Sequence, residues 1–308
     1  MPRTRRGLAW WTLAALLLGA VVWFKLPTLG FYWASTRWAA PPEGPAVGLS
    51  GYRVSIEGLP VQGLSRNASG LSFNPETGTL FTVINRPPQV AELSTDGRLL
   101  RLIELDGVRD PEGITYVEGD RYVIADEDSH SLYWVRIGPG IDRLSVADQP
   151  SLRLSIDVVD NASFEGVSWD SVQQRLYVVK EKLPLRVLVI SGLDVLRESP
   201  RFNLAISEWK SWAAASLFMS DLSSLTLHEA TGNLLLLSDE SALVVEYAAG
   251  GEPVGLLPLW RGFHGLRRKV PQPEGLAIGD DGALYVLSEP NLFYRFDPAE
   301  RPAWAKAR

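Results

Sequence analysis

One short motif occurs five times along the chain, and this recurrence limits the possible folds more than any other feature of the sequence. Each copy has a polar residue, then Ser or Glu two positions later, then Gly in four of the copies, and then an alternating apolar run. The copies begin at Asn67, Asp110, Ser163, Asp221 and Gln272. They recur at intervals of roughly 50 residues, a period that is typical of β-propeller blades with three or four strands each.

Each unit continues as a β-hairpin. A few residues after each motif comes a short polar turn, in most units with Gly, Asn or Asp, the residues that tight hairpin turns favour. We expect the second strands at residues 80–84, 121–125, 175–179, 234–237 and 283–287. A longer connection contains Ile206–Met219, whose good helix formers predict a short helix.

The two ends of the repeat region decide between five blades and six. The last unit has only three strands, while Tyr52–Glu57 is a spare strand before the first unit. A propeller closes its ring by giving the N-terminal strand to the last blade, which leaves no open edge. The sequence therefore predicts an all-β fold with one five-bladed β-propeller over residues 51–300. The 308 residues, 46% of them hydrophobic, are enough for one large domain.

The N-terminal residues have a different composition. Arg3, Arg5 and Arg6 precede Leu8–Phe24, a long run without a charged residue. This pattern predicts a transmembrane signal anchor at residues 1–30, a linker at 31–50, and a propeller in the periplasm. A cleaved signal peptide is the alternative, but the run is longer than a usual signal-peptide core and no clear small-residue cleavage site follows it. The predicted location is the inner membrane, crossed once.

Acidic side chains collect at two positions of the repeat. An inner strand and the strand that returns beside it are antiparallel, so the start of the first and the end of the second lie at one face of the disc. One face of the propeller is therefore expected to carry a ring of oxygen ligands around the axis. The motif positions contribute Glu112, Glu165 and Glu274, and the ends of the returning strands contribute Asn85, Asp126, Glu127, Glu181, Asp239 and Glu289.

Converging carboxylates repel one another unless a cation or a proton compensates. The chain has no Cys, and its three His lie away from the repeated positions, so these oxygen donors predict a hard cation, Ca²⁺ before Mg²⁺. The alternative is structural, with each repeated Glu hydrogen-bonding the backbone at the top of its blade. The residues that start each motif, such as Asp110 and Asp221, are expected to cap turns rather than bind metal.

The sequence also argues against several other functions. A formal net charge of −6 argues against nucleic acid as a partner. The absence of Cys rules out disulfides and a thiol nucleophile. No nucleophile elbow, phosphate-binding loop or dinucleotide fingerprint occurs in the sequence.

Several segments resemble the SdiA-regulated, YjiK-like family of bacterial envelope proteins. They are LFTVIN at 80–85, IADE at 124–127, FEG at 164–166, KEK at 180–182 and LSEPNLFYRF at 287–296. The resemblance covers residues 52–298. It implies a five-bladed propeller, distantly similar to NHL-repeat proteins, with a calcium site and no established activity. The chain departs from the motif at Ser224, where Gly is usual, which weakens the case for a ligand from the fourth blade.

Three functions fit these expectations. The first is a membrane-anchored, non-catalytic Ca²⁺-binding module or scaffold that holds an unidentified protein or small molecule at the acidic face. The second is a calcium-dependent hydrolase of lactones or esters, with Glu127, Glu181, Asp239 or Glu289 as the base. The third is a protein-docking platform that uses the acidic face without a metal.

Overall fold

The computed structural model describes residues 10–17, 19, 30, 44–64, 66–154, 164–180, 185–193, 204–209, 219–302 and 304–305. The chain divides into two units, Met1–Pro42 and Glu43–Arg308. In the first unit residues 10–17 are helical, and no helix among the described residues is long and apolar enough to cross a membrane. Most of the predicted anchor at residues 1–30 and of the linker at 31–50 lies outside the described residues, so the anchor stays a prediction.

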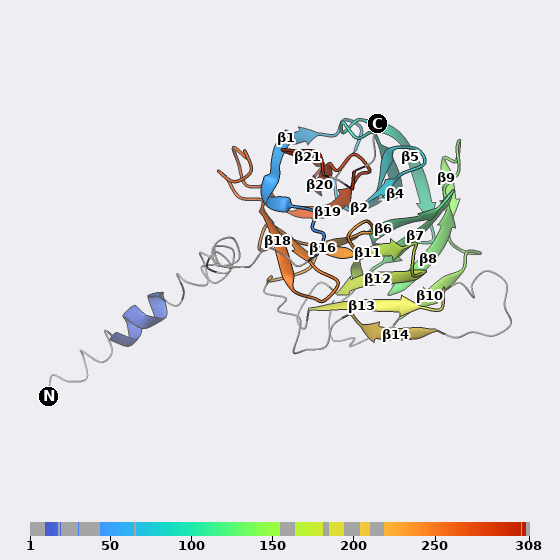
Figure 1. The fold of residues 1–308 in the computed structure, drawn as a ribbon. Coiled ribbons are helices and arrows are strands. Elements are labelled where there is room, and N and C mark those ends of the chain that lie inside the picture. The colour runs from blue at the N-terminus through green and yellow to red at the C-terminus, as the bar shows by residue number, and fades with distance from the viewer. Residues whose placement is uncertain are drawn as a thin grey trace. The chain divides into compact units, whose positions relative to one another are not determined.

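The second unit is a ring of five β-sheets, the blades, with one strand of each at the centre (Figure 1). Blade 1 contains, from the axis outward, β2 (Ala68–Asn74), β3 (Thr79–Asn85), β4 (Pro88–Leu93), β5 (Leu99–Asp106) and β9 (Arg143–Ser145). Blade 2 contains β6 (Pro111–Glu118), β7 (Arg121–Asp126), β8 (Ser131–Arg136) and β10 (Ser151–Arg153). Blade 3 contains β11 (Phe164–Asp170), β12 (Arg175–Lys180), β13 (Arg186–Ser191) and β14 (Ala205–Glu208). Blade 4 contains β15 (Ser224–His228), β16 (Asn233–Ser238), β17 (Leu243–Tyr247) and β18 (Pro253–Pro258). Blade 5 contains β19 (Pro273–Ile278), β20 (Leu284–Ser288), β21 (Leu292–Pro298) and β1 (Tyr52–Pro60).

Blade 5 is built from both ends of the propeller sequence. β1 pairs antiparallel with β21, so that Tyr52 lies opposite Pro298 and Pro60 lies opposite Leu292. The buried Tyr52 hydroxyl donates a hydrogen bond of 2.8 Å to the carbonyl oxygen of Gly282 in the turn before β20. The predicted all-β, five-bladed propeller with a donated N-terminal strand is confirmed, and the second strand of each blade lies within one residue of its expected bounds.

Two connections differ from the sequence-based expectation. The short strand β9, in the connection between β8 and β10, runs parallel to β5 and extends blade 1. Ile206 lies in strand β14 and not in a helix, because β14 pairs with β13 and this pairing supplies its backbone hydrogen bonds. Such tertiary pairing commonly overrides a weak helix propensity. Residues 210–218, the rest of the expected helix, lie outside the described part of the chain.

The motif glycines allow the inner strands to approach one another around the axis. A Cβ atom on Gly113 would lie 2.4 Å from the carbonyl oxygen of Glu165 in the next blade, and one on Gly166 would lie 2.9 Å from the backbone nitrogen of Leu225. Packed protein interiors do not accommodate such distances, so this spacing of the blades requires Gly.

A β-bulge accompanies the glycine in four blades. The pairing of inner and second strands gains one extra residue within Ser69–Ser72, Pro111–Gly113, Phe164–Val167 and Pro273–Gly275. Strand β15 has no such shift, and there Ser224 replaces the glycine and pairs regularly with Leu237. Because a bulge re-aims the side chain beside it, the same local irregularity positions Glu112, Glu165 and Glu274.

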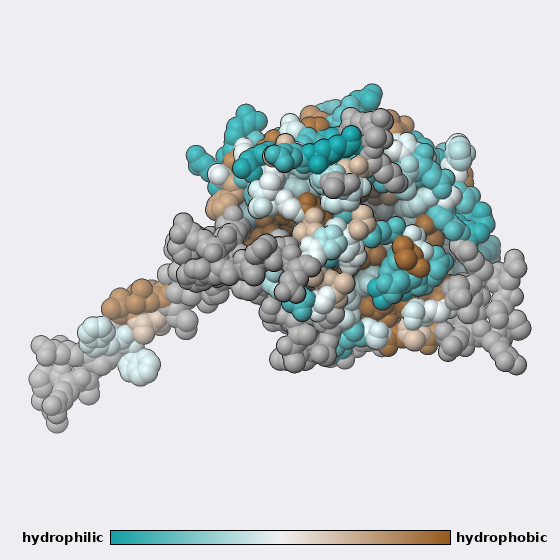
Figure 2. All heavy atoms as spheres, in the orientation of Figure 1, coloured by the Kyte–Doolittle hydropathy of each residue, from teal (hydrophilic) through white to brown (hydrophobic). Residues whose placement is uncertain are grey.

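The hydrophobic core lies between the blades. Buried apolar clusters separate blades 4 and 5, blades 5 and 1, blades 1 and 2, and blades 2 and 3. Phe81 of blade 1 and Tyr122 of blade 2, for example, have ring centroids 4.7 Å apart. On the propeller face that Figure 2 shows, hydrophilic side chains predominate, with apolar ones scattered between them. The blades are thus fixed against one another by side-chain packing, which holds the two ends of the inner strands rigidly.

Candidate metal centre

The starts of the inner strands and the ends of the second strands meet at one face, as the antiparallel pairing predicts. In three blades, a backbone N–H just after or at the end of the second strand donates to the carbonyl oxygen of the residue that starts the motif. These bonds are Asn85 to Asn67 at 3.3 Å, Glu127 to Asp110 at 2.8 Å, and Glu289 to Gln272 at 2.9 Å. In blade 4 the Glu240 N–H donates instead to the carboxylate of Asp221, at 3.1 Å. We call this end of the propeller the acidic face.

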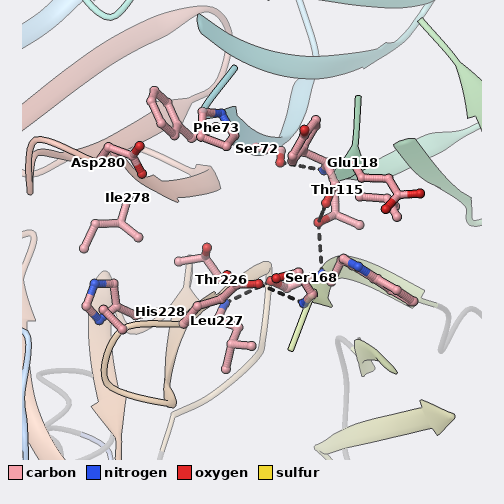
Figure 3. A pocket seen from close by; sticks show the side chains of 18 of the residues that line it. Ser72, Phe73, Thr115, Glu118, Ser168, Thr226, Leu227, His228, Ile278 and Asp280 are labelled. Atoms are coloured by element: carbon pink, nitrogen blue, oxygen red, sulfur yellow. Dashed lines mark hydrogen bonds between the residues drawn. The ribbon is translucent and has the colours of Figure 1, made fainter. Parts of the chain in front are cut away.

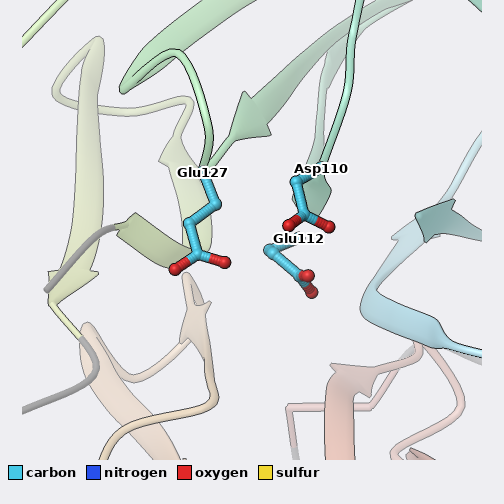
Figure 4. A group of neighbouring side chains, drawn as sticks. All are labelled: Asp110, Glu112 and Glu127. Atoms are coloured by element: carbon cyan, nitrogen blue, oxygen red, sulfur yellow. The ribbon is translucent and has the colours of Figure 1, made fainter. Parts of the chain in front are cut away.

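Three carboxylates of blade 2 converge at the acidic face (Figure 4). Asp110 precedes β6, Glu112 lies at the bulge in β6, and Glu127 follows β7. Each residue offers one carboxylate oxygen, and these three atoms lie within 4.8 Å of one another. Oxygens on opposite sides of a calcium ion, each about 2.3–2.6 Å from it, are about 5 Å apart. The triad can therefore surround one cation without a movement of the backbone.

Two oxygens at this site lack a hydrogen-bond partner among the described residues. The Asn85 side chain, only 8% exposed, donates from Nδ2 to Oε1 of Glu112 at 2.8 Å, while its Oδ1 is buried and unpaired. Oδ1 of Asp110 is also buried and unpaired, and its other oxygen lies 3.9 Å from the guanidinium of Arg86. A buried acceptor without a partner costs about 1–3 kcal/mol. The site thus contains oxygen atoms without a hydrogen-bond partner, and such oxygens are the ligands that a hard cation prefers.

The carboxyl groups at the acidic face have raised pKa values, as expected where buried negative charges lie close together. The pKa of Glu112 is raised to about 7, mainly by burial. The hydrogen bond from Asn85 lowers this pKa, whereas repulsion by Asp110 and Glu127 raises it. Burial also raises the pKa of Glu274 to about 9, and the negative charges of Asp239, Glu112, Glu289 and Asp221 add to the shift. These carboxyl groups come from blades 2, 4 and 5, so carboxylates of three blades act on one another across the axis.

The remaining predicted site residues have other surroundings. Oδ1 of Asp126, which is 1% exposed, accepts the Asp110 N–H at 2.8 Å, and Oδ2 accepts the Ser129 hydroxyl at 2.6 Å. Asp126 therefore fixes the turn that presents Asp110. Glu165 is buried at the bulge of β11, and Glu289 has a pKa raised by burial. Glu181 lies outside the described residues.

The sequence predicts that Asp110 caps a turn rather than binds metal. In the structure its carboxylate lies beside those of Glu112 and Glu127, which makes it a further candidate ligand. A signal for this grouping exists in the sequence, because residues two positions apart in an extended strand point to the same side. Asp110 and Glu112 are such a pair, and among the five copies of the motif only this one has carboxylates at both positions.

Comparisons with known proteins agree with the architecture. The chain is similar to the luciferin-regenerating enzyme, with 13% identity, a TM-score of 0.50, and coverage of 83% of this chain and 99% of that chain. A gluconolactonase from Xanthomonas campestris gives 12% identity and a TM-score of 0.47 over 83% and 94% of the two chains. A chain of a nidogen/laminin complex gives 15% and 0.48 over 77% and 84%. At this identity the first likeness concerns the fold alone, and the other two, with TM-scores below 0.5, support no conclusion.

The family comparison is more specific. The model of the SdiA-regulated family matches residues 45–297, a range that includes nearly all of the five blades. This agrees with the resemblance that the segments from LFTVIN to LSEPNLFYRF suggested. The chain therefore belongs to the SdiA-regulated family.

Proposed function

We propose that this chain is a Ca²⁺-binding β-propeller whose metal centre lies at the acidic face and whose role is to bind a partner rather than to catalyse a reaction. In this proposal residues 1–30 anchor the chain in the inner membrane and the propeller lies in the periplasm. The observation that carries the calcium assignment is the Asp110, Glu112 and Glu127 triad together with the unpaired oxygens of Asn85 and Asp110.

The donor set fits calcium better than other biological metals. Asp110, Glu112 and Glu127 would supply three carboxylates and Asn85 a neutral oxygen, with Glu274 as a further negative charge nearby. The sequence has no Cys, and the three carboxylates leave a negative charge that a divalent ion offsets. Calcium accepts six to eight oxygens in irregular arrangements, whereas magnesium demands an octahedron and zinc prefers nitrogen or sulfur.

A second candidate is the calcium-dependent hydrolysis of a lactone or ester. It is favoured by Glu274, whose pKa is raised to about 9, and by Glu289, whose pKa is also raised, because carboxyl groups with shifted pKa values suit proton transfer at neutral pH. A calcium ion would supply a Lewis acid for the substrate carbonyl. The fold also occurs in the luciferin-regenerating enzyme, so it is compatible with enzymes. A screen of lactones and esters with purified protein tests this candidate.

Thermal unfolding of the full chain, purified in a mild detergent, tests the metal site directly. We expect saturating CaCl₂ to raise the melting temperature by about 5–10 °C over EGTA, since a ligand that binds only the folded state stabilises it. Asp110→Asn and Glu112→Gln should each remove most of this rise. Glu118→Gln, an exposed carboxylate at the other end of the same strand, is the matched control and should retain it. If calcium gives the same small shift in all four proteins, the metal assignment is wrong.

A further inference from the structure

A second site lies at the opposite end of the same inner strands. It is a cavity of about 410 Å³ lined by residues from all five blades (Figure 3). From Glu112 at the acidic face to Tyr116 at the cavity is four residues of one strand, or about 13 Å. Cavities of a few hundred Å³ are the size that binds small organic molecules. The cavity is therefore separate from the candidate metal centre and large enough for a ligand of its own.

A belt of hydroxyl groups forms the inner wall of this cavity, and the belt is incomplete. Five residues after the start of the motif, three hydroxyls accept a backbone N–H of the next blade. These bonds are Tyr116 N to Ser72 Oγ at 2.9 Å, Trp169 N to Thr115 Oγ1 at 3.0 Å, and Leu227 N to Ser168 Oγ at 2.9 Å. The hydroxyl of the equivalent Thr226 makes no hydrogen bond within the described part of the chain, and the fifth blade has Ala277 there.

The side chains around the open sector include His228, Ile278 and Asp280, which lie across the cavity from Thr115 and Glu118 in Figure 3. The His228 ring contacts the Trp304 ring at a centroid distance of 4.0 Å. Burial lowers the pKa of His228 to about 4, so this ring is neutral at physiological pH. Its Nδ1 lies 2.8 Å from the Thr231 hydroxyl.

The charge of the lining has one sign. The charged residues among those that line the cavity are Glu118, Glu229 and Asp280, and no Lys or Arg lines it in the described structure. Glu118 is paired with Arg121, whose Nη1 lies 2.9 Å from its Oε1, so Glu229 and Asp280 carry the argument on charge. Glu76 lies close by, where its Oε1 accepts the Tyr116 hydroxyl at 2.7 Å. A carboxylate-rimmed cavity with a neutral histidine attracts cations and repels anions.

The cavity also has the aromatic surface that organic cations prefer. Phe73, Tyr116, Trp169 and Trp304 belong to its lining. A cation over the face of such rings gains electrostatic attraction in addition to contact area.

We propose that this cavity binds a small organic cation, an amine or a quaternary ammonium compound. The cationic group lies against the aromatic side chains of the lining and near the carboxylates of Glu229 and Asp280. The proposal does not depend on the metal site, because the two sites share no lining residue and lie at opposite ends of the strands.

Calorimetric titration of the full chain with choline tests the proposal, with 3,3-dimethylbutan-1-ol as a neutral ligand of the same shape. Saturating calcium is present throughout, so that the acidic face is not available to the organic cation. We expect choline to bind about tenfold more tightly than the neutral alcohol. Trp304→Leu should weaken choline binding about tenfold, and the isosteric Glu229→Gln should weaken it by a smaller factor.

Glu240→Gln, an exposed carboxylate at the acidic face outside the triad, is the matched control and should leave choline binding unchanged. Equal affinity for choline and the neutral alcohol would overturn the assignment of a cation. Loss of choline binding in Glu240→Gln but not in Trp304→Leu would place the organic cation at the acidic face. If neither ligand gives heat at millimolar concentration, the proposal is refuted.

Discussion

The two ends of the inner strands use the same scaffold in opposite ways. At the cavity end, the hydroxyls of Ser72, Thr115 and Ser168 accept backbone N–H groups of neighbouring blades, so the fold itself satisfies them. At the acidic face, carboxylates crowd together, and the oxygens of Asn85 and Asp110 have no partner among the described residues. The comparison separates polar residues whose hydrogen bonds join the blades from polar residues that we propose bind a ligand. The former should affect stability in every condition and the latter only when the ligand is absent.

The largest expected effect concerns the approach of the blades, on which both ends depend. Gly113→Ala places a Cβ 2.4 Å from the carbonyl oxygen of Glu165, so the strands must separate, and we expect a loss of about 3 kcal/mol in the free energy of unfolding. Denaturant titration measures it. Gly138→Ala in the same blade, where a Cβ meets nothing within 4 Å, should change stability by less than about 0.5 kcal/mol. Equal losses in the two variants would show that close packing is not the reason for the motif glycine.

The next effect belongs to the acidic face and depends on pH. The folded chain holds a proton on Glu274 up to a pKa of about 9, whereas an unfolded Glu loses it near its ordinary value of 4.5. Between these values the folded state binds more protons, so raising the pH destabilises it. In EGTA we expect the free energy of unfolding to fall between pH 7.5 and pH 9 by up to about 1.4 kcal/mol per pH unit. The fall is steeper between pH 6.5 and pH 7.5, because Glu112, with a pKa of about 7, also loses its proton there. Urea titrations at a series of pH values measure this slope.

Two controls isolate that slope. Glu274→Gln cannot ionise and should flatten it, and calcium binding should become tighter as the pH rises, because the ion and the proton compete for the carboxylates. Below pH 6.5 the lowered pKa of His228, about 4, acts in the opposite direction, since protonation there favours the unfolded chain. A slope that persists unchanged in Glu274→Gln above pH 6.5 would contradict the assignment of the proton.

The smallest expected effect comes from the hydroxyl belt. Thr115→Val removes the acceptor of the Trp169 N–H without changing the volume of the side chain and should cost about 1–2 kcal/mol. Thr226→Val removes a hydroxyl that bonds to none of the described residues and should be close to neutral. Neither cost should change with calcium, and thermal unfolding in CaCl₂ and in EGTA checks this. A calcium-dependent cost at Thr115 would mean that the two ends are coupled.

The architecture was predictable from the sequence because the same pattern of motif and hairpin occurs five times. Five copies of a motif, each followed by a hairpin, specify the blades, and the spare strand at Tyr52 specifies the closure. The predictions were wrong or missing for segments that have no equivalent in the other repeats. Strand β9 and the strand at Ile206 depend on a partner strand distant in sequence, and local composition does not encode that partner.

The candidate site was predictable only in part for a related reason. Averaging over the repeat points to the positions that most blades share, such as Glu112, Glu165 and Glu274. The triad instead collects in one blade, where Asp110 and Glu112 are both acidic, a combination that the other copies lack. The cavity at the other end was not foreseen, because it depends on Trp304, which follows the last repeat and meets His228 only in the folded ring.

Strand β1, which closes the ring, limits the order in which the propeller can fold. β1 is synthesised before every other strand of the propeller, yet its partner β21 is the last of them. Until residue 298 has emerged, β1 has no neighbour in its own sheet, and an unpaired strand is prone to pair with other chains. In the proposed topology, with the propeller in the periplasm, residues 51–298 must therefore cross the membrane before the ring can close. The unfinished propeller would need protection from aggregation for that whole interval.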